Sequence, residues 1–333
     1  MPAPAQGLDP AELTRRWFPG VAIEGVRRLE GGWMNDVFAI DSEAGPLVLR
    51  VLQPEATAEM ISWSHHLLDR IAPRLSTVQP PLRTPGGATT VEVNDRLATL
   101  ERFVEGRLGN RAGSDIEPAA RALGALHAVL AEVDDVQPRS GYPRFADLDW
   151  RENRWWSWSR VDRELVAFRV DIEVIERALE EVPPALASVD STALPLHPIH
   201  GDYHEENLLL EPSGEPAGVA GIEAAEVAAI IDWDECRLDW RMWDIANALW
   251  SLCRTEANTG LVPSEAARFL GAYESTGLIV LPEERMLIAL CTRATRLFEA
   301  LWGLGEMQRG HAGWDYVQQN IIAIDGIEEL GVG

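Results

Sequence analysis

The sequence predicts an α+β protein in two parts: a small antiparallel sheet with one helix, followed by a larger helical part. Three observations lead to this prediction. Short β-branched runs separated by turn residues occupy the chain before Gly106. Apolar residues at helical spacing dominate the remainder. One non-helical island, residues 194–210 and 227–235, interrupts these helices.

The first part, residues 1–104, is expected to contain five strands and one helix. Residues 57–71 carry apolar side chains at helical spacing, and Pro73 ends the helix. Asn94-Asp95 is a turn pair typical of a β-hairpin. The expected strands are a first one running from residue 21 toward the glycine pair Gly31-Gly32, then 37–40, 46–52, 89–93 and 97–104.

The second part, residues 105–333, is expected to be mainly helical. Its first helix should begin at Ser114 or Asp115, with Pro118 in the first turn. Pro183-Pro184 should end an amphipathic helix over 161–182. The stretch GEPAGVAGIEAAEVAA, within the island, is interpreted as a long hairpin connection. Further helices are expected over 240–254, 263–275 and 282–306.

Composition limits the classes of partner. The chain has 333 residues and a formal net charge of −24, from 53 acidic and 29 basic residues. Nucleic-acid binders usually carry a basic surface, so a DNA or RNA partner is not expected. The sequence contains no lysine, so all 29 basic residues are arginine. Chemistry that normally uses a lysine must therefore use arginine or proceed without a cation.

The sequence also indicates a cytoplasmic protein without a membrane partner. No run approaches the roughly 18 to 20 apolar residues that a membrane-spanning helix needs. The N-terminus lacks the basic start and apolar segment of a secretory signal. The three cysteines, Cys236, Cys253 and Cys291, form neither a disulfide framework nor a CxxC metal pattern.

The island contains the residues that indicate catalysis. In HGDYHEEN, Asn207 follows Asp202 by five residues, the spacing H-x-D-x-x-x-x-N of kinase catalytic loops. An apolar run then leads to Asp232 in IIDWDE. Phosphoryl transfer needs a carboxylate beside the attacking hydroxyl, which we assign to Asp202. It also needs oxygen ligands for Mg²⁺, and Asn207 and Asp232 can supply them.

Two upstream features are candidates for binding ATP phosphates. Gly31 and Gly32, before a strand pair, would let the backbone approach phosphate oxygens closely, although glycine pairs more often mark ordinary turns. Arg50, in VLRV, lies where kinases place a strand lysine, and its guanidinium can bind phosphate bidentately. The alternative for Arg50 is an ordinary arginine on the surface of a strand.

Together these segments resemble the aminoglycoside-phosphotransferase-like family of small-molecule kinases, which includes choline and homoserine kinases. The resemblance covers nearly the whole chain, with ERFVEGR, LGALHAVL and DWRMWDIA as supporting segments. It implies a two-lobed protein-kinase-like fold with ATP in the cleft between the lobes. It places the adenine on the backbone of Arg102, Phe103 and Val104. It also implies that Asp244 holds the backbone of the catalytic loop.

The chain departs from the family pattern at two positions. Arg50 replaces the strand lysine. The helix glutamate that pairs with this cation is Glu59 by its position on the helix, with Ser64 or His65 as alternatives for the matching turn.

Other signals have less specific interpretations. His200 and His204 are four residues apart but have no evident third ligand, so we interpret His200 as structural. The tryptophans of DWRENRWWSWSR could bind a quaternary ammonium, but helix packing is the simpler interpretation. Acidic residues near the loop could bind an amine, whereas Arg293 and Arg296 could face a carboxylate or phosphate. The acidic residues are Glu205, Glu206, Asp234, Glu235 and Asp239.

We therefore expect ATP- and Mg²⁺-dependent transfer of phosphate to a hydroxyl of a small molecule by a monomer or homodimer. Aminoglycosides, amino sugars, choline and homoserine-like compounds are the candidate acceptors. One alternative is a nucleotide-binding pseudokinase acting as a regulatory module. Another is a protein Ser/Thr kinase of the same fold, although no APE-type activation segment is evident.

Overall fold

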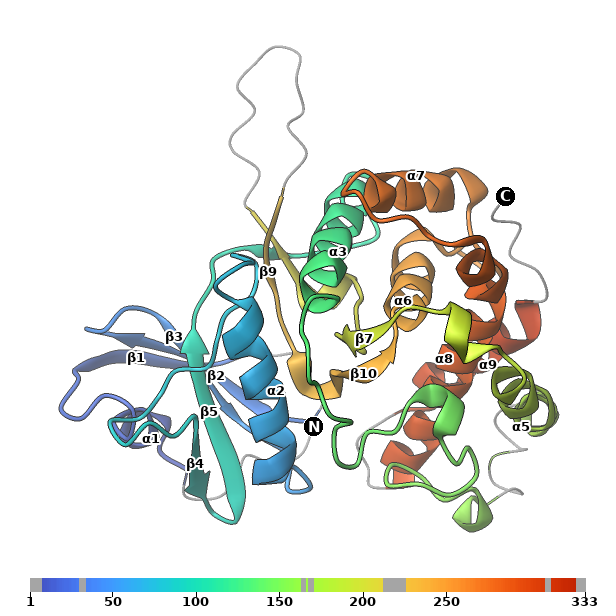
Figure 1. The fold of residues 1–333 in the computed structure, drawn as a ribbon. Helices are drawn as coiled ribbons and strands as arrows, with labels where there is room; N and C mark the ends of the chain where they lie inside the picture. Colours follow the sequence, from blue (N-terminus) through green and yellow to red (C-terminus); the bar gives the residue numbers. More distant parts are fainter. Residues whose placement is uncertain are drawn as a thin grey trace.

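The computed structural model of the protein describes residues 8–29, 34–162, 166, 171–211, 226–308 and 313–327. A five-stranded sheet with helix α2 (Ala58–Ile71) forms one part, and the other part is largely helical. Figure 1 shows these two parts side by side, with α2 on the side of the sheet that faces the helices. The predicted α+β architecture is confirmed.

The sheet is antiparallel, with the strand order β1-β2-β3-β5-β4. All five predicted strands are present. The turn between the last two uses Asn94 and Asp95, both left-handed with φ of 48° and 59°, as a two-residue hairpin requires. The strands are β1 (Ile23–Arg28), β2 (Asp36–Ser42), β3 (Leu47–Val51), β4 (Thr90–Val93) and β5 (Arg96–Arg102).

The two faces of the sheet have different partners because side chains alternate along each strand. Leu49 and Val51 of β3 pack on the face covered by Leu13 and Trp17, from the segment around the short helix α1 (Pro10–Thr14). Arg50 points to the opposite face, toward α2. Strand alternation therefore directs Arg50 toward the helical part of the protein.

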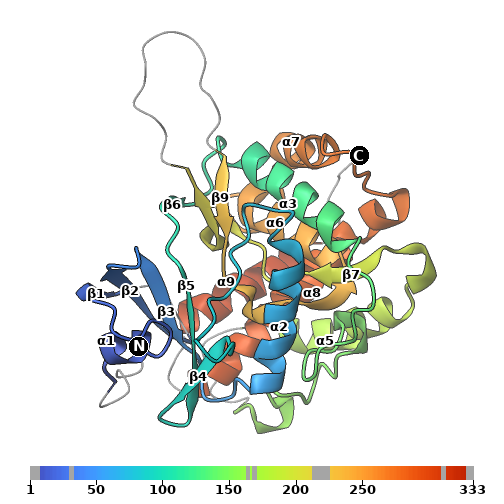
Figure 2. The same ribbon diagram turned by 60° about the vertical axis from the view of Figure 1, so that its left-hand side comes forward.

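Helix α2 connects the two parts through its apolar side chains. Thr57 caps its N-terminus by accepting a hydrogen bond from the amide of Met60. Ile61 packs with sheet residues, whereas Leu68 and Ile71 belong to the large core of the helical part. Figure 2, turned by 60°, shows α2 beside β5, where the sheet borders the helical part.

Short strands form the non-helical island predicted within the helical part. They pair as β6-β8-β9 and as β7-β10. Leu210 of β8 pairs with Val227 of β9, so these strands flank the predicted long hairpin connection, most of which, residues 212–225, lies outside the described residues. The strands are β6 (Arg107–Leu108), β7 (Leu196–Ile199), β8 (Leu208–Leu210), β9 (Val227–Ile230) and β10 (Arg237–Trp240).

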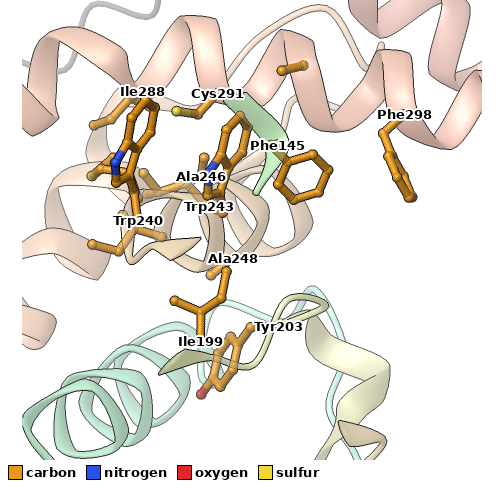
Figure 3. Close-up of a cluster of buried hydrophobic side chains, with 14 of the residues drawn as sticks. Phe145, Ile199, Tyr203, Trp240, Trp243, Ala246, Ala248, Ile288, Cys291 and Phe298 are labelled. Carbon is orange, nitrogen blue, oxygen red and sulfur yellow. The ribbon is translucent and has the colours of Figure 1, made fainter. Parts of the chain in front are cut away.

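Helix α6 lies at the centre of the helical part, since every one of its residues is buried. Trp240 and Trp243, at its N-terminal end, stack in parallel against the α8 side chains Ile288 and Cys291 (Figure 3). None of the described helices is long and apolar enough to cross a membrane. The helices are α3 (Ile116–Leu130), α5 (Ile172–Ala187), α6 (Met242–Cys253), α7 (Pro263–Glu274), α8 (Pro282–Gln308) and α9 (Trp314–Gly326).

The expectation that Pro183-Pro184 ends a helix is wrong. Helix α5 continues through both prolines to Ala187. Val182 and Leu186, one turn apart, are both buried in the large core, so tertiary packing on either side of the prolines maintains the helix despite the lost hydrogen bonds. Helix α9 was not expected from the sequence.

The tryptophan-rich segment contributes to the core. Trp150, Trp155, Trp156 and Trp158 are all buried in the large hydrophobic cluster. Trp155 and Trp156 each contact the Phe298 ring edge-on. The packing interpretation of this segment is therefore confirmed.

Candidate active site

The catalytic loop is attached to the core through the buried carboxylate of Asp244, in the first turn of α6. Asp244 accepts hydrogen bonds from the backbone amides of His200 and Gly201, both at 2.8 Å. It also accepts one from Nε2 of the buried His127, whose Nδ1 accepts a hydrogen bond from Tyr273. Asp244 therefore fixes the backbone where the resemblance places an anchoring aspartate.

Asp202 and Asn207 face each other across the loop. The Asn207 side-chain amide donates to the Asp202 backbone oxygen at 2.9 Å and to Oδ2 at 3.1 Å. The same nitrogen lies 3.0 Å from Nε2 of His204, so it faces the loop and Oδ1 of Asn207 is left to bind another group. Asn207 is the last residue of a short 3-10 helix, η4 (Glu205–Asn207), which follows Asp202 in the loop.

His204 stabilises the ionised form of Asp202. Its Nε2 lies 3.3 Å from Oδ2 of Asp202. Burial lowers the pKa of His204, but the Asp202 carboxylate outweighs this effect and raises the pKa to about 9. Burial likewise raises the pKa of Asp202, but His204 and the Asn207 hydrogen bond hold it well below its usual range. The carboxylate is therefore ionised across the physiological pH range.

The backbone of Ile231 joins the catalytic loop to the loop that carries Asp232. Its amide donates to the Asn207 carbonyl at 2.9 Å, and its carbonyl accepts from Nε2 of His200 at 3.0 Å. Nδ1 of His200 accepts from the Asp202 amide at 3.3 Å, and burial lowers the pKa of His200, which keeps the ring neutral as this acceptor role requires. His200 thus takes a structural position between the loops. Asp232 follows in the left-handed conformation, with φ of 61°.

Gly201 allows the two loops to approach each other. Its φ is +83°, and a Cβ atom there would lie far inside van der Waals contact with the carbonyl oxygen of Glu235. Both the backbone conformation and the close approach exclude a side chain at this position.

Arg50 connects the sheet to the Asp232 loop. One of its terminal nitrogens lies 2.9 Å from Asp232 and 2.8 Å from Asp234, and the other lies 3.9 Å from Glu101. Asp234 also accepts a hydrogen bond from the Asn35 side chain at 2.7 Å. The strand cation is therefore surrounded by three carboxylates.

Of the alternatives for the turn of α2 that faces Arg50, the structure shows Ser64 and His65, and Glu59 does not pair with Arg50. Glu59 is exposed in the first turn of α2, and the helix instead presents Ser64 and His65 to the cavity that Arg50 lines. The carboxylate near the second guanidinium nitrogen comes from Glu101 on β5. Thr99 pairs directly with Arg50, so Glu101, two residues further along, is a diagonal neighbour on the same face.

The segment that joins the two parts, residues 102–104, has few backbone amides that are free to bind a ligand. The amide of Phe103 already donates to the Pro46 carbonyl, and the Arg102 side chain donates to the Ala44 carbonyl. Among the described residues, the amide of Val104 has no backbone partner. Of Phe103 and Val104, Val104 therefore has the available amide. Gly31 and Gly32 lie outside the described residues.

The oxygen groups present fit a magnesium ion that is also held by phosphates. Mg²⁺ commonly uses one or two carboxylates together with substrate phosphates and water. Oδ1 of Asn207 and the exposed carboxylate of Asp232 are on neighbouring loops joined by Ile231. Among the described residues, no group of three or more His, Cys, Asp or Glu side chains is placed to hold a metal ion.

Sequence reasoning did not assign a role in this site to Asn35, Glu101 or His204, and considered Asp234 only as a binder of amines. The roles of two of these residues could have been predicted from the sequence. Asp234 is two residues beyond Asp232, and Glu101 alternates onto the face of Arg50. The contacts of Asn35 and His204 depend on loop conformations that spacing does not specify.

Residues 25–286 match the model of the phosphotransferase enzyme family. This match spans most of the chain. The protein belongs to the phosphotransferase enzyme family. It is therefore a phosphotransferase of the kinase type, and the HGDYHEEN and IIDWDE segments lie within the matched residues.

The phosphotransferase is similar to proteins named homoserine kinase from two bacteria. The one from Ralstonia pickettii (strain 12J) is 24% identical, with 76% of this chain and 72% of the relative covered. The one from Caulobacter sp. (strain K31) is also 24% identical, with 94% of this chain and 92% of the relative covered.

Solved structures share the fold of the phosphotransferase at low sequence identity. A microcompartment-associated aminopropanol kinase has a TM-score of 0.67 at 15% identity, covering 95% of this chain and 98% of that one. An aminoglycoside phosphotransferase in a ternary complex with AMP-PNP and hygromycin B has a TM-score of 0.62 at 15% identity, covering 96% and 99%. These likenesses establish the two-lobed protein-kinase-like fold.

Gly201→Ala should destabilise the phosphotransferase more than Gly277→Ala. Gly277 also has a positive φ, +96°, but nothing lies within 4 Å of a Cβ there, so its substitution isolates the conformational cost. That cost is about 1–2 kcal/mol for a left-handed alanine. Gly201→Ala adds the overlap with the Glu235 carbonyl, so its loss in free energy of unfolding should be at least about twice as large. Chemical denaturation of both variants measures this, and equal losses would show that the loops do not meet at Gly201.

Proposed function

We propose that the protein transfers the γ-phosphate of ATP, with Mg²⁺, to a hydroxyl of a small molecule. The observation that supports this most is the convergence of Asp202, Asn207 and Asp232 on two loops held together through the backbone of Ile231. Positioning and charge neutralisation account for most of the catalysis in this class of reaction. Rigid attachment of these three side chains is therefore the property that the reaction needs.

Asp202 orients the acceptor hydroxyl. Its carboxylate is ionised because the pKa lies well below the usual range, so it accepts a hydrogen bond from the hydroxyl at neutral pH. The same low pKa makes it a weak proton acceptor before the hydroxyl begins to react. Its main contribution is thus to direct the oxygen toward the phosphorus.

Asn207 and Asp232 would hold Mg²⁺, which neutralises negative charge on the phosphates when it is bound. Arg50 would contact the α/β-phosphates, and Glu101 would orient its guanidinium from the neighbouring strand. Val104 would bind the adenine through its backbone. In this proposal residues 1–104 and 105–333 act as two lobes with ATP between them.

The names of the relatives support a small acceptor that carries a hydroxyl. Homoserine kinases and an aminopropanol kinase act on compounds of a few carbon atoms, and hygromycin B is a larger amino sugar derivative. All of these compounds carry at least one amino group, which agrees with the acidic net charge of the chain.

Acceptor-dependent release of ADP tests the proposed function. With Mg²⁺ and ATP, the parent protein should release ADP only in the presence of an acceptor from the panel homoserine, aminopropanol, ethanolamine and hygromycin B. Asp202→Asn should retain Mg·ATP binding but lose kcat by about 10²-fold or more, the scale of the loss when reacting groups are no longer positioned. Asp134→Asn, which changes an exposed carboxylate after α3, is the matched control. Full activity of Asp202→Asn would remove this residue from the mechanism.

Arg50→Ala should weaken ATP binding while leaving adenosine binding nearly unchanged. A hydrogen-bonded charge contributes about 1.5–3 kcal/mol, which corresponds to a loss of ATP affinity of about tenfold or more. Arg50→Lys should recover part of this loss, and Arg27→Ala, on the exposed edge of β1, should have no effect. Calorimetric titration measures all four proteins. Parental ATP affinity in Arg50→Ala would mean that this arginine only balances the carboxylates, and would favour a nucleotide-independent role.

A further inference from the structure

Arg139 is a buried cation in the segment that follows α3, and it joins this segment to two other elements. The residue is 3% exposed. One terminal nitrogen donates to the backbone carbonyls of Asp234 and Cys236, both at 2.7 Å. Its Nε donates to the carbonyl of Met60, in the first turn of α2, at 3.2 Å. The guanidinium therefore connects the loop that carries Asp232 to the helix that packs on the sheet.

The segment around Arg139 lies along α2. Nε1 of Trp63, on α2, donates to the backbone carbonyl of Gln137 at 2.8 Å. Arg70, in the last turn of the same helix, donates to the carbonyl of Asp134, also at 2.8 Å. These contacts extend over several turns of the helix. The segment is therefore fixed to α2 independently of Arg139.

Aromatic side chains stabilise the buried charge of Arg139. Its guanidinium carbon lies 3.8 Å from the centre of the Tyr142 ring and 5.8 Å from that of Trp63. A cation above an aromatic face is attracted by the ring electrons. A planar guanidinium can stack on a ring while its edge donates several hydrogen bonds, which an ammonium group cannot do. The position thus uses the shape of arginine as well as its charge.

Asp232 needs support on both sides because its backbone is strained. Its φ of 61° lies in the left-handed region, which a residue with a side chain enters only at a cost in free energy. On the N-terminal side, Ile231 is tied to the catalytic loop through His200. On the C-terminal side, one 3-10 turn, η5 (Trp233–Glu235), follows, and Arg139 binds carbonyls within and directly after it. The loop is thus fixed to the helical part before Asp232 and to α2 after it.

Arg50 also contacts the Asp232 loop, but in a different way. One of its terminal nitrogens lies 2.9 Å from Asp232 and 2.8 Å from Asp234. In the proposed function this guanidinium binds phosphates, so the carboxylates must share it with the nucleotide. The carbonyl contacts of Arg139 use no group that binds a ligand. They can therefore persist when the nucleotide and the metal are bound.

Arg154 approaches the same surroundings without reaching the Asp232 loop. Its guanidinium carbon lies 4.8 Å from the centre of the Tyr142 ring, and a terminal nitrogen lies 3.3 Å from Sδ of Met60. In the described part of the chain, no hydrogen bond joins Arg154 to residues 232–236. Arg154 therefore provides a control that has the same charge and a shared aromatic neighbour but lacks the attachment to the loop.

We propose that Arg139 is a positioning residue for the metal: by holding the backbone after Asp232 against α2, it places the Asp232 carboxylate to bind Mg²⁺ together with the nucleotide phosphates. This inference rests on the proposed function, in which Asp232 is a metal ligand. Arg139 acts through the backbone of the loop and touches neither the nucleotide nor the acceptor. Its loss should therefore weaken binding of the metal–nucleotide complex and leave binding of the metal-free nucleotide unchanged.

The affinity gained on addition of Mg²⁺ measures this effect. Calorimetric titration gives the dissociation constant of AMP-PNP, a non-hydrolysable ATP analogue, with excess Mg²⁺ and with EDTA, and the ratio of the two is the metal-dependent gain. Asp232→Asn, which removes a proposed ligand, should lose most of this gain. Arg139→Gln should reduce it by about tenfold or more, the scale for lost hydrogen bonds from a charged group. The dissociation constant of Arg139→Gln in EDTA should stay close to that of the parent.

Three further variants separate positioning from general support of the fold. Arg139→Lys keeps the charge but loses the planar fork, so its gain should be intermediate. In Arg139→Ala, added methylguanidinium should restore part of the gain, because it can occupy the vacated space and bind the same carbonyls. Arg154→Gln, the matched control, should keep the gain of the parent.

The outcomes distinguish this inference from the function on which it rests. If Asp232→Asn loses the gain and Arg139→Gln keeps it, the inference is overturned and the proposed metal ligand stands. Equal weakening of AMP-PNP with Mg²⁺ and with EDTA in Arg139→Gln would show general support of the fold and also overturn the inference. If Arg139→Gln loses the gain but no acceptor yields ADP, the positioning role stands and the proposed function fails. Should Arg139→Gln fail to fold, a reduced gain in Arg139→Lys would support the inference and a parental gain would overturn it.

Discussion

The buried carboxylate of Asp244 is the interaction on which the site depends. It fixes the amides of His200 and Gly201, and so sets the start of the catalytic loop. The His200 ring then holds the backbone of Ile231, and the next residue in the chain is Asp232. Asp232 in turn meets Arg50 from the sheet. One buried acid at the start of α6 thus supports a series of contacts that reaches the other part of the protein.

Because the chain contains no lysine, the strand cation is an arginine and is held through a guanidinium. A guanidinium can contact several carboxylates at once, and Arg50 contacts Asp232 and Asp234 through one nitrogen while Glu101 lies near the other. The helix carboxylate expected for a strand lysine is absent from the facing turn of α2, where Ser64 and His65 lie. The cation is therefore oriented from within the sheet and from the Asp232 loop.

Much of the fold and the central part of the site could be predicted from sequence. The five strands and the turn at Asn94-Asp95 follow from local patterns, which the structure retains. The spacing of Asp202, Asn207 and Asp232 indicated the two loops, because this chemistry constrains residue types and separations together. These signals are local, so a single sequence contains them.

The errors arise where tertiary contacts override local preference. The helix through Pro183-Pro184 persists because buried side chains flank the prolines. The sequence could not choose between Glu59 and Ser64 or His65 for the turn that faces Arg50, because the rotation of α2 about its axis, set by packing of Ile61 and Leu68, turns Glu59 to solvent. The contact of Arg50 with Glu101 requires the register of two strands that are fifty residues apart in sequence.

Hydrogen exchange of Asp244→Asn most directly tests whether a buried charge organises the active site. This substitution preserves the size of the side chain but removes its negative charge. The carboxylate accepts the hydrogen bonds from the amides of His200 and Gly201. These amides should exchange about 10- to 100-fold faster, the range for lost hydrogen bonds to a charged group, while strands β2 and β3 keep their protection. Unchanged exchange over residues 200–207 would show that the loop is held by other contacts and would contradict the central role of Asp244.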